Sequence, residues 1–380
     1  MHAAVFYGPG NISNENVNCD YRYPPRKESS SYQNSKGDLL LKVKACAVCG
    51  YDVRVFRNGH YKVVPPVILG HEICGQTIEE ILVTNAMVSD LKGNQVLRIE
   101  PGSRVAVSPI IPCLNCVYCS RGQFNLCLSL IEIGSSINGG FGEFVKIPEQ
   151  LVKIGGLVPV PDNLSDEEAA LLEPLACCLN GIYHLHPIIR RKQKGTVAII
   201  GDGPIGLLHL QLVRKIYNKK RVTVIGRISQ RLHEAKRMGA NGTIEFANDA
   251  ELDDCIESAL ELTEKVGFNV IIIATSNPIA LSVALKIASK DSAINIFAGM
   301  SKTTHGVFSI DPNFLHYNQI SLTGSFSSTP RMLRDAVKFA SKGHVNLSKL
   351  VSHKYPLEEI IQAIVTTEKY HGLRAVINKF

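Results

Sequence analysis

One segment restricts the possible folds of this chain more than any other: a glycine-rich turn between an apolar run and a helical pattern. The apolar run Thr196–Ile200 predicts a buried strand, and Gly201-Asp202-Gly203-Pro204-Ile205-Gly206 follows it directly. In this G-x-G-x-x-G spacing the first glycine permits a tight turn, the second lets the backbone approach a pyrophosphate, and the third lets a helix pack on the strand. The N-terminus of that helix then faces the phosphates. The segment predicts a dinucleotide site at Gly201, Gly203, Pro204, Ile205 and Gly206.

Strand and helix patterns alternate beyond this turn. The helical patterns cover Pro204–Tyr217, Gln230–Met238 and Ile279–Ala288, and the strand patterns cover Arg221–Ile225, Asn269–Ala274 and Ala293–Ala298. Repeated strand–helix units at this spacing predict an α/β architecture with a doubly wound parallel sheet. We assign this sheet to residues 176–324.

The remaining parts of the chain have a different character. Residues 1–175 contain short β-like runs separated by Gly and Pro turns, such as Leu39–Ala45 and Ile73–Leu82, which predict a compact β-rich domain. Residues 325–380 carry two helical patterns and a final strand pattern, and this length is too short for a confident independent domain. We expect this last segment to return to the first domain. A chain of 380 residues agrees with two domains.

Composition limits the classes of protein that remain. Hydrophobic residues make up 45% of the chain and charged residues 20%, the balance of a soluble globular protein. No apolar run reaches the roughly 18 residues of a membrane helix, and the first residues predict a strand rather than a signal peptide, so we expect a cytoplasmic location and no membrane contact. The formal net charge of +7 is modest for this length, and we expect no nucleic-acid partner.

Four of the 11 cysteines form a cluster. Cys113, Cys116, Cys119 and Cys127 have the spacing C-x2-C-x2-C-x7-C. Four thiolates within such a short loop can surround one tetrahedral Zn²⁺ and leave no position for a substrate, which predicts a structural site. An iron–sulfur cluster is the alternative that this spacing leaves open.

A second set of metal-binding residue types lies outside this cluster. Cys49 follows a predicted strand, and His71-Glu72 follows an apolar run. A thiolate, an imidazole and a carboxylate suit a Zn²⁺ that keeps one position free. Glu173 adds a carboxylate, which the pattern places at the end of an apolar helix.

The end of the second predicted strand bears on the type of dinucleotide. An acidic residue is expected there to bind the ribose 2′-hydroxyl of NAD, but the chain has Gly226 followed by Arg227, with Arg231 one turn later. Glycine removes a carboxylate that would repel a 2′-phosphate, and arginine can pair with that phosphate. The pattern favours NADP(H) over NAD(H). In the alternative interpretation, both arginines are ordinary solvated residues at a helix start.

Taken together, these motifs resemble the zinc-dependent medium-chain dehydrogenases/reductases of the alcohol dehydrogenase superfamily, over nearly the whole chain. The matching segments are Cys49-Gly50-x-Asp52, Gly70-His71-Glu72, the four-cysteine lobe, Glu173-Pro174-Leu175, the glycine loop, Arg231-Leu232 and Met238-Gly239-Ala240. Glu173 stands where classical alcohol dehydrogenases carry cysteine, which is similar to the sorbitol/threonine dehydrogenase branch. The resemblance implies a GroES-like catalytic domain, a Rossmann coenzyme domain, an active site in the cleft between them, and a homodimer or homotetramer.

The resemblance also implies roles for single residues. The catalytic zinc is surrounded by Cys49, His71, Glu72 and Glu173. In this branch some of the carboxylates bind the zinc directly, and others bind it through its water molecule. Asp52 orients His71. Tyr51 stands where the family has a proton-relaying Ser or Thr. Its hydroxyl can take that role; alternatively Tyr51 lines the pocket and the proton passes through Glu72, zinc-bound water or His60.

The activity implied is reversible oxidation of a secondary alcohol, such as a polyol, to a ketone, with hydride transfer to NADP(H) and two zinc ions per chain. The expected partner of the protein is therefore a small-molecule substrate, an alcohol or a ketone. One alternative is an NAD-linked sugar or amino-alcohol dehydrogenase. Another is a non-catalytic zinc- and nucleotide-binding protein whose cysteine lobe and positive charge contact nucleic acid.

Overall fold

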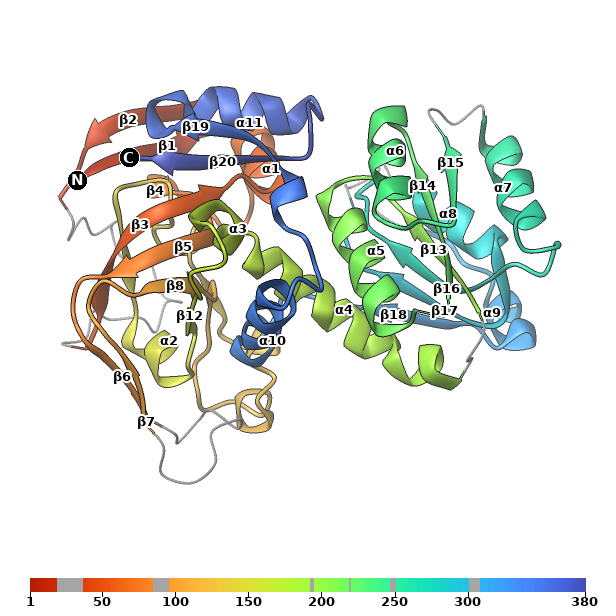
Figure 1. Ribbon diagram of the computed structural model, residues 1–380, viewed down its shortest axis with the longest axis horizontal. Helices are drawn as coiled ribbons and strands as arrows, with labels where there is room; N and C mark the ends of the chain where they lie inside the picture. Colours follow the sequence, from red (N-terminus) through yellow and green to blue (C-terminus); the bar gives the residue numbers. More distant parts are fainter. Residues whose placement is uncertain (19–36, 85–95, 192–194, 219, 247–250, 301–307) are drawn as a thin grey trace. The chain divides into compact units, whose positions relative to one another are not determined.

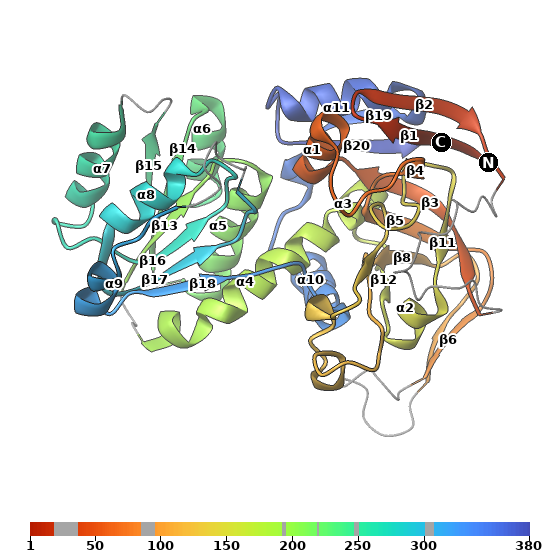
Figure 2. The ribbon, with the colours of Figure 1, turned by 180° about the vertical axis from the view of Figure 1, so that it is seen from behind.

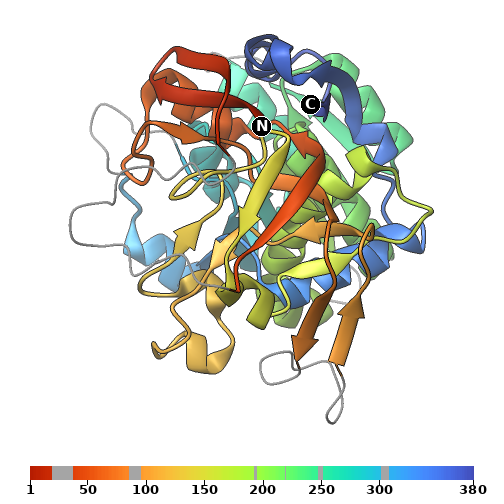
Figure 3. The same cartoon turned by 90° about the vertical axis from the view of Figure 1, so that its left-hand side faces the viewer.

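The computed structural model describes residues 1–18, 37–84, 96–191, 195–218, 220–246, 251–300 and 308–380. These residues form two compact units: unit 1 comprises Met1–Ala176 and Ser327–Phe380, and unit 2 comprises Cys177–Phe326. Both chain termini belong to unit 1 (Figures 1 and 3). The last segment of the chain is therefore part of the same compact unit as the first.

A seven-stranded sheet forms the centre of unit 1. Its order is β12-β8-β5-β3-β20-β19, with β11 also paired to β3. The strands are β3 (Leu39–Ala47), β5 (Glu72–Thr77), β8 (Arg104–Val107), β11 (Phe144–Ile147), β12 (Leu157–Pro159), β19 (Val351–Pro356) and β20 (Arg374–Lys379). Ala47 of β3 lies opposite Glu72 on one side and opposite Val376 on the other. This register brings the end of β3, the start of β5 and the start of β20 together at one end of these neighbouring strands.

Shorter sheets complete the β-rich part of unit 1. They are β2 (Asn11–Asn16) with β1 (His2–Gly8) and β4 (Val67–Ile68), β6 (Ile81–Thr84) with β7 (Val96–Ile99), and β9 (Ile110–Ile111) with β10 (Ile131–Glu132). Figure 3 shows the orange β6–β7 pair projecting from unit 1. The predicted single run Ile73–Leu82 is thus two strands. The charged pair Glu79-Glu80 between them favours a solvent-exposed turn.

Helices and short 3₁₀ turns connect these strands. They are α1 (Gly50–Asn58), α2 (Glu149–Lys153), α3 (Asp166–Ala170), α10 (Pro330–Ser341), α11 (Ile360–Glu368), η2 (Cys119–Arg121), η3 (Phe124–Leu126), η5 (Ser348–Leu350) and η6 (Leu357–Glu359). Helix α3 begins with a capping box: Ser165 Oγ accepts the Glu168 N–H at 3.2 Å, and Glu168 Oε2 accepts the Ser165 N–H at 2.9 Å.

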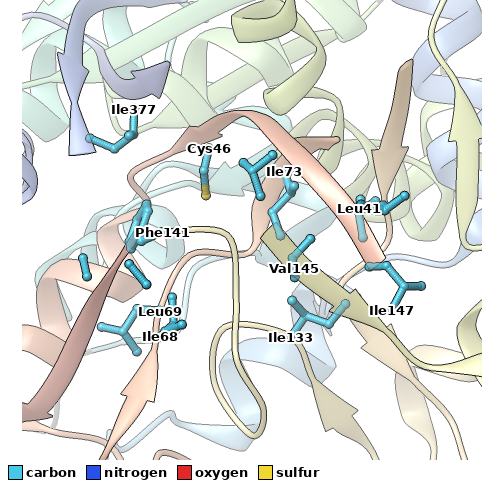
Figure 4. Packing of buried hydrophobic residues seen from close by; sticks show 14 of the residues in the cluster. Leu41, Cys46, Ile68, Leu69, Ile73, Ile133, Phe141, Val145, Ile147 and Ile377 are labelled. Atoms are coloured by element: carbon cyan, nitrogen blue, oxygen red, sulfur yellow. The ribbon is translucent and has the colours of Figure 1, made fainter. Parts of the chain in front are cut away.

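The core of unit 1 is a cluster of buried hydrophobic residues, part of which is drawn in Figure 4. Its labelled members come from strands and loops that are distant in sequence: Leu41, Cys46, Ile68, Leu69, Ile73, Ile133, Phe141, Val145, Ile147 and Ile377. Gly70 packs against this core with φ +91°, and a Cβ there would lie 2.8 Å from Cys46 Sγ. Only glycine fits this position, so the backbone directly before His71 is fixed by close packing.

Helix α4 (Leu172–Arg191) starts in unit 1 and continues into unit 2. The sequence pattern predicts that a helix ends near Glu173, whereas α4 begins at Leu172. Among the described residues, no helix has both the length and the apolar character that a membrane crossing requires.

Unit 2 confirms the predicted doubly wound parallel sheet. Six parallel strands have the order β15-β14-β13-β16-β17-β18. They are β13 (Thr196–Ile200), β14 (Arg221–Gly226), β15 (Gly242–Glu245), β16 (Phe268–Ile273), β17 (Ala288–Ile296) and β18 (Ser321–Gly324). The helices α5 (Pro204–Ile216), α6 (Ser229–Arg237), α7 (Leu252–Glu261), α8 (Ile279–Lys286) and α9 (Pro312–Asn318) flank the sheet (Figures 1 and 2). The order reverses between β13 and β16, the place where dinucleotides bind in such sheets.

Candidate metal and coenzyme sites

The sheet register of unit 1 brings three of the predicted metal ligands together. Cys49 caps the N-terminus of α1 directly after β3, and His71 and Glu72 stand at the start of β5. The Cys49 sulfur, a His71 ring nitrogen and a Glu72 carboxylate oxygen all lie within 4.8 Å of one another. The ligand atoms of a tetrahedral zinc ion are roughly 3.3–3.8 Å apart, given bonds of about 2.0–2.3 Å. The three side chains therefore need only small adjustments to hold one ion.

The hydrogen bonding of these side chains supports the fit of a cation. Glu72 is 1% exposed, and its Oε2 has no hydrogen-bond partner in the structure. A buried carboxylate oxygen without a partner is costly unless a cation balances it. The donor set of one thiolate, one imidazole and one carboxylate is that of a zinc ion with a fourth position open.

Asp52, in the first turn of α1, connects two of these ligands. Its carboxylate is fully buried; Oδ2 accepts the Cys49 backbone N–H at 2.8 Å, and Oδ1 lies 3.6 Å from His71 Nδ1. Burial lowers the pKa of His71, but the charge of Asp52 and the contact with Cys49 outweigh burial and raise that pKa well above its ordinary value. Asp52 thus lies where a carboxylate can fix the orientation of a metal-bound imidazole.

Arg374 is part of this site, although sequence reasoning did not single it out. It is 4% exposed, its Nη2 lies 3.0 Å from Glu72 Oε1 as a charge contact, and its Nη1 donates to the Val48 carbonyl at 3.0 Å. Burial lowers the pKa of Arg374, but the charges of Glu72 and Cys49 raise it above its ordinary value overall. One oxygen of Glu72 is therefore occupied by Arg374, and the other is left for a metal ion.

Glu173 stands at the start of a helix, whereas the sequence pattern predicts that it stands at the end of one. It lies in the first turn of α4 and is 7% exposed. The group of three potential ligands does not include it, but its charge also raises the pKa of Arg374. Of the four residues predicted around the catalytic metal, the structure brings together Cys49, His71 and Glu72. Glu173 acts on the same site electrostatically.

Tyr51 lies beside these ligands. Its ring meets the His71 ring edge to face, with centroids 5.7 Å apart. Its hydroxyl is 2.9 Å from Ser135 Oγ and 3.2 Å from His60 Nδ1. Burial raises the pKa of Tyr51 to about 12. The tyrosine is thus a neutral hydroxyl at ordinary pH, connected to one residue that was predicted, His60, and one that was not, Ser135.

The four cysteines of the lobe converge on one point. The sulfurs of Cys113, Cys116, Cys119 and Cys127 all lie within 4.8 Å of one another. Backbone N–H groups of Leu128 and Cys119 lower the pKa of Cys116 to about 6, whereas burial raises the pKa of Cys119 to about 12. Every cysteine within the described residues is a free thiol. Four convergent sulfurs without a disulfide suit a closed tetrahedral metal site.

The glycine turn of unit 2 has the geometry that a phosphate loop requires. Gly201 has φ +125°, and its N–H donates to the Ile225 carbonyl at 2.8 Å. A Cβ on Gly206 would lie 1.9 Å from the Gly201 carbonyl oxygen, so a larger residue would separate helix from turn. Gly203 caps α5, and Pro204 and Ile205 open it. The N–H groups of this first turn are placed to bind an anion.

Asp202, inside the same turn, is a second residue that sequence reasoning missed. Its Oδ2 accepts the backbone N–H of Arg227 at 2.9 Å and of Ile228 at 2.7 Å. A Cβ on Gly226 would lie only 2.4 Å from Asp202 Cβ. Asp202 therefore fills the space that a side chain at position 226 would need. The signal in the sequence was the pairing of an acidic residue in the turn with a glycine at the end of the next strand.

The two arginines differ in their surroundings. Arg227 is exposed, whereas Arg231 is only 7% exposed, and its Nη1 lies 3.9 Å from the position of a Cβ on Gly203. Arg231 is therefore packed beside the glycine turn and is not an ordinary solvated residue.

Two family models match the chain. The alcohol dehydrogenase GroES-like domain matches residues 35–162, and the zinc-binding dehydrogenase domain matches residues 204–342. The first match covers most of the β-rich part of unit 1, with both groups of potential metal ligands. The second covers most of unit 2 and continues into α10.

Curated relatives and solved structures agree with these matches. D-arabitol-phosphate dehydrogenase of Enterococcus avium is 29% identical over 340 residues, 89% of each chain. Sorbitol dehydrogenase of Bacillus subtilis (strain 168) is 30% identical over 333 residues, 86% of this chain and 85% of the relative. A zinc-binding dehydrogenase from Sinorhizobium meliloti 1021, solved with NADP, is 28% identical, with a TM-score of 0.80 over 99% of this chain and 98% of that one. The chain thus belongs to the zinc-dependent medium-chain dehydrogenase/reductase family, in its sorbitol/threonine dehydrogenase-like branch, and is a zinc-type alcohol dehydrogenase.

Proposed function

We propose that the protein catalyses the reversible oxidation of a secondary alcohol, of the polyol class, to a ketone, with hydride transfer to NADP(H). The observation that carries this proposal is the group formed by Cys49, His71 and Glu72, in which Glu72 Oε2 is buried and has no hydrogen-bond partner among the described residues. Such a group holds a zinc ion by three protein atoms and leaves one position for a substrate oxygen. The polyol class is supported by the names of the relatives, which act on sorbitol or D-arabitol phosphate.

The residues around the metal have separate tasks in this proposal. A zinc ion bound there acts as a Lewis acid, which lowers the pKa of an alcohol and polarises a carbonyl. Asp52 would hold the His71 ring in a fixed orientation, and Arg374 engages one oxygen of Glu72 so that the other would be available to a metal ion. Glu72 would be the direct carboxylate ligand, and Glu173 would remain outside the coordination sphere. In the alcohol-oxidation direction, a hydride leaves the carbon for the coenzyme and a proton leaves the hydroxyl.

We further propose a second, structural zinc ion in the lobe of Cys113, Cys116, Cys119 and Cys127. All four positions of that ion are filled by protein sulfurs, so it stabilises the lobe and takes no part in the reaction.

Preference for NADP(H) is supported by the end of β14. Gly226 offers no carboxylate of its own, Arg227 is exposed directly after it, and Arg231 packs beside the glycine turn. Arginine is well suited to bind a 2′-phosphate through two hydrogen bonds.

One observation favours the second candidate, an NAD-linked sugar or amino-alcohol dehydrogenase. The Asp202 carboxylate lies against Gly226. An acidic side chain is therefore present at the end of β14, although position 226 itself carries none. Its Oδ2 is already engaged by two backbone N–H groups, and for this reason we rank NADP(H) first.

We also expect a cytoplasmic homodimer or homotetramer.

A substrate panel tests the proposed reaction. Polyols, sugars, amino alcohols and simple secondary alcohols are assayed with both coenzymes, in zinc-loaded and chelator-treated protein. The expected result is polyol-dependent reduction of NADP⁺ that disappears with the metal. Turnover that survives complete removal of zinc would contradict the proposal.

Binding measurements test the coenzyme preference without any substrate. Dissociation constants for NADPH and NADH are compared by fluorescence in the wild type, Arg227→Ala and Asp202→Asn. We expect tighter binding of NADPH, with about a tenfold loss for NADPH alone in Arg227→Ala, equivalent to about 1.4 kcal/mol. Equal wild-type affinities, or an Arg227→Ala variant that leaves both constants unchanged, would favour the NAD-linked alternative.

A further inference from the structure

We propose that Asp202 and Gly226 form a coupled pair that sets the coenzyme preference, with Asp202 as the residue that positions the backbone of Arg227. The inference rests on the preference for NADP(H) in the proposed function. It goes beyond that preference because it assigns the preference to a carboxylate inside the glycine turn and states which exchange of residues reverses it.

Asp202 joins the glycine turn to the segment between β14 and α6 (Figure 1). Its side chain is 8% exposed, and its Oδ2 accepts the backbone N–H of Arg227 at 2.9 Å and of Ile228 at 2.7 Å. The Ile228 carbonyl in turn accepts the N–H groups of Arg231 and Leu232, in the first turn of α6. One side chain of the turn therefore holds both the backbone of Arg227 and the start of α6.

Helix α6 has no capping side chain of its own. Its N-cap residue is Ile228, and Ser229 Oγ donates to Glu245 Oε2 at 2.6 Å. Asp202 supplies a carboxylate to this helix start from outside the helix, where the helix dipole favours negative charge. A buried carboxylate that accepts two N–H groups is also well compensated for its loss of water. Because α6 carries Arg231, the positions of both arginines depend on Asp202.

Asp202 also decides which residue fits at position 226. A Cβ on Gly226 would lie 2.4 Å from Asp202 Cβ, 2.6 Å from its Cγ and 2.8 Å from its Oδ2. The strand end is held on two sides, because the Gly201 N–H donates to the Ile225 carbonyl and the Phe246 N–H donates to the Gly226 carbonyl, each at 2.8 Å. A shift of the strand end would break these bonds. Position 226 must therefore be glycine while Asp202 is present.

The pair has a direct consequence for the choice between the two coenzymes. An acidic side chain at this strand end binds the ribose 2′-hydroxyl of NAD, and its charge opposes the 2′-phosphate of NADP. In this chain the carboxylate lies in the turn after β13 and is bonded to two N–H groups, while the strand end has glycine followed by the exposed Arg227. The arrangement favours a 2′-phosphate. Transfer of the acidic residue from position 202 to position 226 should reverse the preference.

The experiment compares four proteins: the wild type, Asp202→Gly, Gly226→Asp and the variant with both substitutions. Dissociation constants for NADPH and NADH are measured by fluorescence titration, and Tm is recorded for each protein. Gly226→Asp alone should weaken binding of both coenzymes about tenfold or more, because the added side chain forces the turn and the strand apart. In the double variant this clash is absent. NADH should then bind within about threefold of its wild-type affinity, and more tightly than NADPH.

Two single variants separate positioning from charge. Asp202→Gly should raise the dissociation constant of NADPH about tenfold and that of NADH by less than about threefold, because only NADPH has the 2′-phosphate that arginine binds. Asp202→Asn should keep the preference for NADPH, because an amide oxygen can accept both N–H groups.

Asp311→Gly is the matched control for the loss of a carboxylate at a helix start. Asp311 accepts the backbone N–H of Asn313 at 2.9 Å and caps α9, in the same unit. This control should lower Tm, as Asp202→Gly does, but should leave the ratio of the two dissociation constants at the wild-type value.

The outcomes distinguish the coupled pair from the proposed function. If Gly226→Asp changes the two constants equally with and without Asp202, or if Asp202→Gly keeps the wild-type ratio, the inference alone is overturned. A wild type that binds NADH more tightly than NADPH would overturn the NADP(H) preference of the proposed function and, with it, the inference.

Discussion

At the scale of single residues, Glu72 shows how one side chain is prepared for a metal ion by a partner far away in the sequence. Its Oε1 lies 3.0 Å from Arg374 Nη2, and its Oε2 is buried with no hydrogen-bond partner in the part of the chain that the structure describes. The cost of burying this carboxylate is only partly compensated by the arginine. A cation at Oε2 completes the compensation, so the site is electrostatically prepared for metal before any metal binds.

His209 is the clearest case of a buried titratable group without a catalytic task. It lies in α5, is fully buried, and neither of its ring nitrogens has a hydrogen-bond partner in the described structure. Its ring contacts Phe297 edge to face, with centroids 4.6 Å apart. Burial lowers the pKa of His209 to about 3. The folded chain therefore keeps this imidazole neutral across the physiological pH range.

We predict that His209 makes the protein less stable in mild acid. Below the unfolded pKa of 6.5 the unfolded chain binds a proton that the folded chain refuses until about pH 3, so folding stability falls across that window. By pH 5 the loss should be about 2 kcal/mol relative to pH 8. His209→Leu should remove most of this loss in urea unfolding at the two pH values. His184→Leu, at an exposed position of α4, is the control and should keep the wild-type dependence.

At the scale of elements, the glycine turn and α5 act as one rigid part. Gly201 turns the chain with a positive φ, and Gly206 allows α5 to touch that turn. The N–H groups at the start of α5 are aimed at an anion only while this contact holds. Small changes in the packing of α5 should therefore act on coenzyme affinity.

Gly206→Ala tests this coupling. The added Cβ would lie 1.9 Å from the Gly201 carbonyl oxygen, so the turn and the helix must move apart. Overpacking of this kind costs about 1–3 kcal/mol, and we expect the NADPH dissociation constant to rise about tenfold or more. Gly324→Ala, where a Cβ meets nothing within 4 Å, should bind NADPH as the wild type does. Unchanged affinity in Gly206→Ala would show that the turn tolerates the movement.

The cysteine lobe is an element with little core of its own, since its segments are the short turns η2 and η3. Cys116→Ser should remove one zinc ion per chain and lower Tm by about 5–10 °C, while freshly prepared protein keeps its turnover. Cys177→Ser, outside both groups of potential ligands, serves as the comparison and should retain both ions. Immediate loss of turnover in Cys116→Ser would mean that this metal is not purely structural.

The same scale shows why some elements could be predicted from sequence and others could not. The strand–helix alternation of unit 2 was visible because its inner strands, such as Thr196–Ile200 and Phe268–Ile273, are short apolar runs that are almost entirely buried. Helix α4 is not evident from the sequence pattern because Gly181 and Pro187 interrupt it. Glu173 was therefore placed at the end of a helix, although it stands at the start of one.

At the scale of the whole molecule, the ligand types of the site were predictable, but their partners were not. Cys49, His71 and Glu72 lie in motifs that can be read locally, as do the four lobe cysteines. Arg374 reaches Glu72, and Ser135 reaches Tyr51, only through sheet pairing and loop packing between distant segments. No local pattern encodes such contacts. The two-domain α/β architecture followed from sequence because it depends on periodicity and motifs, whereas these partners depend on tertiary contacts.

Zinc content measured together with turnover tests the central claim most directly. The wild type should contain two zinc ions per chain. Cys49→Ala and His71→Ala should each retain one, lose turnover by about 1000-fold or more, and bind NADPH with the wild-type dissociation constant. Full turnover in a metal-free preparation, or in either variant with only one zinc ion, would contradict the account.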